Sequence, residues 1–256
     1  MIFSRKRFRF SKQQPNEIVK RLKQSWHLLY ATFLILHFKI CYSHNIHDYG
    51  IPLGYYSNLW ICNVSILLSV GGILFHYPTI VASSIIAVSS SHLAWICDSI
   101  LMFFTGELSG PFQIADYTTL RKNELWYRIW VNSHHLWFIP LNMLYIKGRS
   151  EKFRITLKHY FGGAIWVWLI SGITILLIPN KCMETIFDDG KSRCLFININ
   201  MIRKWWGSDN IDVLHWFDRS NGVSAWIYFV YANFIYSGVM NGFCYFFLKK
   251  YMMGQK

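Results

Sequence analysis

Two adjacent histidines, His134 and His135, lie in the apolar run NSHHLWFIP. Cys62 and Asn63 lie in a second apolar run, and Asp98 lies in a third. An imidazole beside a thiol can take its proton and make a nucleophilic thiolate, and a third group that orients the ring completes a triad. If the three runs meet in space, these residues supply the parts of a catalyst for acyl transfer.

The composition predicts that these runs are membrane spans. Of the 256 residues, 53% are hydrophobic and only 15% are charged, which exceeds the apolar share of an ordinary soluble domain. A helix needs about 20 apolar residues to cross a hydrocarbon core. Runs of this kind occupy 25–42, 56–76, 79–104, 126–146, 159–179 and 222–248. We therefore expect an all-α, multi-pass integral membrane protein, a polytopic bundle of about six transmembrane helices. The run 25–42 is the weakest because Lys39 lies near its end.

Positive charges predict the orientation of this bundle. Lys and Arg residues concentrate in the N-terminal segment 1–24 and in the link between the fourth and fifth runs, so both are expected on the cytoplasmic side. The protein is then N-in and C-in, with 1–24 as a basic cytoplasmic segment, 25–256 as one membrane domain and 180–221 as a long outer loop. The net charge of +13 favours membrane lipids as partners over nucleic acid. The oligomeric state and the type of membrane remain open.

The six cysteines predict neither a metal site nor a cofactor. They form no CxxC motif and no Cys/His spacing of the zinc type. Cys182 and Cys194 both lie in the predicted outer loop, where a disulfide and two free thiols are both open alternatives. Cys62, Cys97 and Cys244 lie within predicted spans, where a free cysteine ordinarily packs as a small hydrophobe.

Several polar residues fall at one depth when each span is counted from its outer end. Cys62 lies about seven residues into the second span and His135 about nine into the fourth. Ionisable groups in a bilayer rarely face lipid, so a shared depth is expected of a pocket open to the outer leaflet, or of a structural hydrogen-bond network. The other members of this layer are Asn63, Asp98, His134, Ser171, Thr174, Tyr228, Tyr231 and Asn233, and His92 lies about a turn and a half deeper in the third span.

The motifs WICDSILMFFTG, ADY and HLWFIP resemble an uncharacterised family of six-span bacterial membrane proteins. In that family a W-x-x-D, a T-G seven residues past the aspartate, a D-Y and an H-x-W recur in this order. The resemblance covers roughly 57–180 and implies the six-span fold but no particular activity. The residues that it singles out are Asp98, Asp116, Tyr117 and His135.

The segment LWICNVSILL is similar to the L-H-L-C-D segment on the second helix of YwaF-like six-helix membrane proteins. Some eukaryotic relatives of that architecture are lipid acyltransferases, and a six-helix group related to the androgen-induced protein hydrolyses fatty-acid esters with a hydroxyl nucleophile and a histidine. The resemblance implies Cys62 as nucleophile and His135 as base. The sequence departs from the pattern at Trp60 and Asn63, so the orienting role would pass to Asp98.

Two classes of function follow. The first is lipid acyl transfer or lipid ester hydrolysis in a pocket facing the outer leaflet, with Cys62, His135 and Asp98 as catalytic residues. The alternative is a non-catalytic membrane protein, either a transporter or proton relay or a partner-binding subunit, in which Asp98 and His135 form a buried polar network. The candidate substrate-binding residues are Asn63, His134, Asp116, Tyr117, Tyr231 and Asn233.

Overall fold

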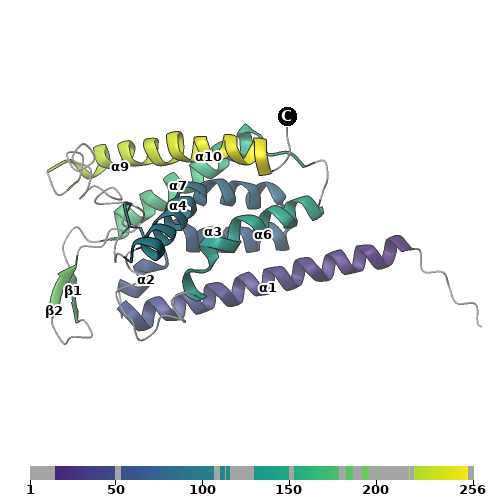
Figure 1. Ribbon diagram of the computed structural model, residues 1–256, viewed down its shortest axis with the longest axis horizontal. Coiled ribbons are helices and arrows are strands. Elements are labelled where there is room, and N and C mark those ends of the chain that lie inside the picture. Colours follow the sequence, from purple (N-terminus) through teal and green to yellow (C-terminus); the bar gives the residue numbers. More distant parts are fainter. Residues whose placement is uncertain are drawn as a thin grey trace, which may run out of the picture.

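The computed structural model describes residues 15–49, 53–106, 110–112, 114–115, 130–149, 153–178, 183–186, 192–195, 200, 219 and 222–252. These residues form a bundle of helices with one short pair of strands (Figure 1). The helical elements are α1 (Pro15–Tyr49), α2 (Leu53–Ser57), α3 (Ile61–Leu74), α4 (Pro78–Thr105), α6 (His134–Arg149), α7 (Leu157–Leu177), α9 (Ala225–Asn233), η5 (Phe234–Met240), α10 (Asn241–Phe247) and η6 (Leu248–Met252).

The predicted helical class is confirmed, and helices lie at all six apolar runs. Two of them, α4 and α7, are long and apolar enough to cross a membrane. Helix α3 is apolar but has only 14 residues. The run from α9 to η6 alternates α and π segments, each of which is shorter than a span. The number of membrane crossings and the N-in, C-in orientation therefore stay predictions.

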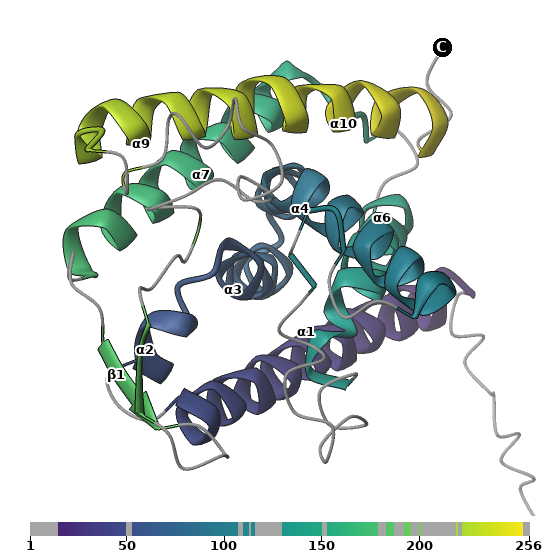
Figure 2. The ribbon, with the colours of Figure 1, turned by 60° about the vertical axis from the view of Figure 1, so that its left-hand side comes forward.

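Helix α4 is the centre of the bundle. Pro78 stands in its first turn, where a missing N–H costs nothing, and Gly106 ends it with a left-handed φ of 71°. It packs against α3, α6, α7 and α10, and Figure 2 shows it between the α9–α10 run and α1. Every side chain from 81 to 92 is buried. This helix therefore carries its polar residues into the interior of the protein.

Small and polar residues allow the neighbours of α4 to approach it closely. A Cβ added at Gly163 of α7 would lie 2.9 Å from the carbonyl oxygen of Ser83 and 3.1 Å from the backbone nitrogen of Ala87. On the α10 side, the Asn241 side-chain oxygen accepts hydrogen bonds from the backbone N–H (3.1 Å) and the hydroxyl (2.6 Å) of Ser90. These contacts fix α4 between α7 and α10.

Part of the predicted outer loop lies against the bundle. The Asn200 side chain accepts a hydrogen bond from the backbone N–H of Ile61 (2.8 Å) and donates one to the carbonyl oxygen of Leu59 (2.7 Å). Strands β1 (Met183–Ile186) and β2 (Ser192–Leu195) pair antiparallel, with Glu184 opposite Cys194. Cys182, the other candidate for the outer disulfide, lies outside the described residues. Asn200 thus ties this loop to the first turn of α3.

Candidate metal centre

Four histidines from three helices meet inside the bundle. The ring centroid of His134 lies 5.4 Å from that of His37, 5.8 Å from that of His92 and 4.1 Å from that of His135. All four side chains are buried. Helix α1 supplies His37, α4 supplies His92, and α6 begins with the adjacent pair. We call this set the histidine layer and include in it the two cysteines beside it, Cys41 and Cys62.

Two backbone carbonyls hold the rings of the adjacent pair. The Nδ1 atom of His134 lies 2.9 Å from the carbonyl oxygen of Val131, and Nδ1 of His135 lies 2.9 Å from that of Asn132. A carbonyl oxygen only accepts hydrogen bonds, so each Nδ1 carries the hydrogen and the lone pair is on Nε2. The Nε2 atom of His134 is buried and has no hydrogen-bond partner among the described residues. Histidines that bind metals are commonly held in this way through their other nitrogen.

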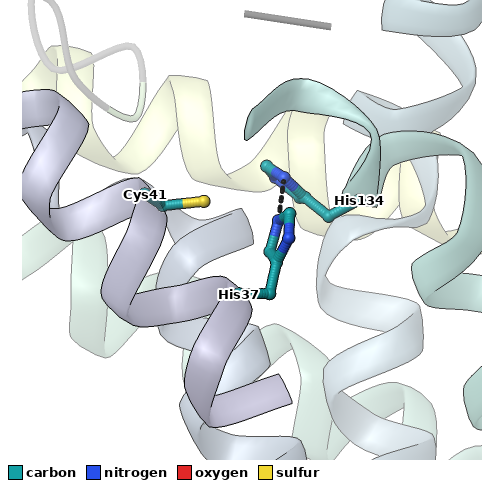
Figure 3. Close-up of side chains that lie close together, drawn as sticks. All are labelled: His37, Cys41 and His134. Atoms are coloured by element: carbon teal, nitrogen blue, oxygen red, sulfur yellow. Dashed lines mark hydrogen bonds between the residues drawn. The ribbon is translucent and has the colours of Figure 1, made fainter. Parts of the chain in front are cut away.

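The first group of candidate ligands joins α1 to α6 (Figure 3). His37 and Cys41 are four residues apart on α1 and therefore lie on the same helix face. The Nε2 atom of His37 lies 3.4 Å from Nδ1 of His134, and the thiol of Cys41 donates to the carbonyl oxygen of Val131 over 3.5 Å. One ligand atom from each of His37, Cys41 and His134 lies within 4.8 Å of the other two. We call these three residues the α1 triad.

A second group shares His134 and adds a thiol from α3. Ligand atoms of Cys62, His134 and His135 also lie within 4.8 Å of one another. The two histidines are buried, and Cys62 is half-buried. We call these three residues the α3 triad. Each triad offers one sulfur and two imidazole nitrogens, a donor set that suits zinc and copper and not calcium or magnesium.

Aromatic rings surround the histidine layer. Trp95 stacks on His135 with the ring centroids 4.7 Å apart and the planes 14° from parallel. Trp137 meets His37 edge-on at 4.8 Å, and Phe138 meets His92 at 5.7 Å. These rings exclude water from one side of each imidazole, so charges in the layer interact in a medium of low polarity.

The structure brings two of the three predicted catalytic residues together. Cys62 and His135 both belong to the α3 triad. The carboxylate of Asp98 accepts hydrogen bonds from the backbone N–H groups of Phe112 (2.9 Å), Ile114 (2.8 Å) and Ala115 (3.4 Å). Both of its oxygens therefore hold the loop that follows α4.

The predicted substrate-binding residues lie in different places. His134 is the residue that the two triads share. The amide of Asn63 donates to the carbonyl oxygen of Ser57 over 3.3 Å, and that of Asn233 donates to a carbonyl one turn earlier in its own helix over 2.9 Å. Tyr231 is half-buried against the apolar core. Asp116 and Tyr117 lie outside the described residues.

Sequence reasoning missed His37 and Cys41 as partners of His134, and it placed His92 deeper in the bundle than the adjacent pair. The cysteine and histidine spacing along the chain gave no zinc pattern, because the ligands come from separate helices. The i, i+4 spacing of His37 and Cys41 on α1 was the signal that could have found the α1 triad, since it places two ligands on one helix face.

The sequence matches no family model, and neither the curated proteins nor the solved structures contain a match to it. The resemblance to six-span bacterial membrane proteins therefore stays a prediction, and function is argued from the geometry of the layer.

Proposed function

We propose that this chain is an integral membrane protein whose histidine layer binds a soft transition-metal ion. The observation that carries the proposal is the α1 triad, in which three buried ligand atoms from two helices lie within 4.8 Å of one another. Thiolate and imidazole are the ligands that copper and zinc prefer. The backbone carbonyl on Nδ1 of His134 supplies the outer hydrogen bond that orients such a ligand.

Unpaired nitrogens favour metal binding over a purely structural network. Among the described residues, Nε2 of His134, Nδ1 of His37 and both ring nitrogens of His92 are buried without a hydrogen-bond partner. Each unpaired polar group in an interior costs about 1–3 kcal/mol. Most buried polar atoms in proteins are paired, so these nitrogens are candidates for a further partner. An ion that takes up lone pairs in the layer recovers part of this cost.

The distribution of polarity supports the membrane part of the proposal. Large apolar side chains lie on the outside, and Phe103, Phe104 and Phe243 are 81%, 79% and 71% exposed. Polar side chains such as Ser84 and Asn142 are fully buried. Exposed apolar surface of this extent marks a lipid-facing or partner-facing protein. The length and composition of α4 and α7 agree with insertion in a bilayer.

Metal retention by the purified full-length chain tests the proposal. The protein in detergent is loaded anaerobically with Cu(I), or in parallel with Zn(II), passed over a chelating resin and analysed for bound metal. We expect the wild type to retain one of these ions and His134→Phe to lose it, because Phe fills the ring volume without a nitrogen. His27→Gln on α1 and Cys244→Ser on α10 are matched controls outside the layer and should retain the ion.

Retention of the same amount of metal by His134→Phe would contradict the proposal. So would a wild-type protein that emerges from the resin without copper or zinc. Loss of metal from the control variants would show that the assay reports damage to the fold and not loss of a ligand.

A second candidate function rests on the closeness of Cys62 to His135. Their ligand atoms lie within 4.8 Å, a separation that one water molecule can bridge for proton transfer. This geometry supports lipid acyl transfer or ester hydrolysis with Cys62 as nucleophile. A lipid-like electrophilic probe should then label the wild type and Cys244→Ala but not Cys62→Ala, with much weaker labelling of His135→Ala. Equal labelling of all four proteins, or of none, would remove Cys62 as a nucleophile.

A further inference from the structure

We infer that the ion is a single Cu(I), and that it exchanges between the α1 triad and the α3 triad through His134. This inference rests on the proposed function, since it names the ion and the way in which the layer holds it. Two features carry it: the charge that each triad offers to an ion, and the membership of His134 in both triads.

The single negative charge of each triad favours a monovalent ion. A cysteine binds metals as a thiolate, so each triad contributes one negative charge and two neutral imidazoles. Cu(I) makes the complex neutral, whereas a divalent ion leaves one positive charge in an apolar interior, which is costly. Asp98 is the only acidic residue whose side chain the structure describes, and its oxygens are engaged by backbone N–H groups of the loop after α4. A second positive charge therefore has no described carboxylate to balance it.

The shared histidine limits the protein to one ion. A neutral imidazole has one lone pair, because its other nitrogen carries a hydrogen. His134 belongs to both triads, so it can serve only one of them at a time. Two ions at once would require the ring to lose its one N–H hydrogen as well and become an imidazolate, which a neutral histidine does not do at ordinary pH. The two triads are therefore alternative positions for one ion.

Exchange between the positions balances without an outside reactant. In the α1 position the ion is bound to the thiolate of Cys41, while Cys62 keeps its thiol hydrogen. When the ion moves, the Cu–S bond to Cys41 and the Cu–N bond to His37 break, and bonds to the sulfur of Cys62 and a ring nitrogen of His135 form. The proton released by Cys62 goes to the sulfur of Cys41, and copper stays Cu(I) throughout. His134 belongs to both triads and stays a ligand throughout; because the nitrogen that faces His37 is Nδ1, the ring hydrogen is on Nε2 while the ion is in the α1 position.

Titration of the full-length protein with Cu(I), against a chromophoric Cu(I) chelator and without oxygen, tests the inference. We expect the wild type to bind one Cu(I) per chain. Cys41→Ser and Cys62→Ser should each still bind one ion, with affinity reduced about twofold if the two positions are equally populated. The double variant should lose measurable binding, and Cys244→Ser should match the wild type.

Three results would overturn the inference while leaving metal binding intact. Two Cu(I) per chain in the wild type would mean two independent sites, and this result needs no variant. Complete loss of binding in either single variant would mean that both thiolates hold the ion together. Retention of Zn(II) in place of Cu(I) under competition would mean a divalent site. Absence of any bound metal in the wild type would instead refute the proposed function itself.

Discussion

Replacing Asp98 by Asn should destabilise the bundle and leave metal binding unchanged. The carboxylate is fully buried and accepts the N–H groups of Phe112 at one oxygen and of Ile114 at the other, at 2.9 and 2.8 Å. An amide has only one oxygen, so in either orientation its NH₂ group faces one of these two backbone donors. The substitution therefore removes one acceptor and the negative charge together.

The magnitude follows from these contacts. A hydrogen bond to a charged group contributes about 1.5–3 kcal/mol, and the backbone N–H left unpaired costs about 1–3 kcal/mol more. We therefore expect Asp98→Asn to lower the free energy of unfolding by about 2.5–6 kcal/mol. For a chain of this size each kcal/mol lowers Tm by roughly 2–4 °C, so the fall should be on the order of 10 °C.

Thermal unfolding in detergent, followed by tryptophan fluorescence, measures this effect. Cys97→Ser is the matched control, since Cys97 precedes Asp98 on the same helix and is half-buried. It should change Tm only slightly. A Tm for Asp98→Asn within about 2 °C of the wild type, or loss of bound metal at unchanged Tm, would refute the assignment of Asp98 to the loop.

Three further predictions follow from the same structure. Gly163→Ala should push α7 away from α4 and cost about 1–3 kcal/mol in unfolding measurements, whereas Gly148→Ala, where a Cβ meets nothing within 4 Å, should be tolerated. Asn241→Leu should cost about 1–3 kcal/mol because it removes the acceptor of the Ser90 hydroxyl, and an unchanged Tm would exclude this role. Cu(I) affinity should fall as pH is lowered, because protons compete for the thiolate and imidazole ligands, and an affinity independent of pH would exclude thiolate ligation.

Helix α4 could be predicted closely from its apolar length, whereas the run 25–42 covers only the middle of α1 and the run 56–76 is divided between α2 and α3. The run 79–104 differs by one residue at each end from α4, Pro78–Thr105, whose ends carry a proline and a glycine. The last run was predicted as one span, whereas the structure divides it into α and π segments from Ala225 to Met252; in the first π segment the Tyr236 hydroxyl donates to the carbonyl of Ala87. The pattern of apolar residues does not distinguish such short π segments from a continuous α-helix.

The site could be predicted only in part, because depth can be counted along a chain and helix rotation cannot. Counting depth placed Cys62, His134 and His135 at one level, and the structure places them within one triad. The rotation of α1 about its own axis decides that His37 and Cys41 both face His134. The partners of Asp98 were unpredictable for another reason, since they are backbone N–H groups of a loop and carry no side-chain signature.

The most direct test of metal binding in the histidine layer is X-ray absorption spectroscopy of the copper-loaded wild-type protein. Each triad offers one sulfur and two imidazole nitrogens, so the account predicts a coordination sphere of sulfur together with the multiple-scattering signature of imidazole. A sphere of oxygen atoms alone, or of sulfur without imidazole, would contradict it, because no position that includes His134 could produce either.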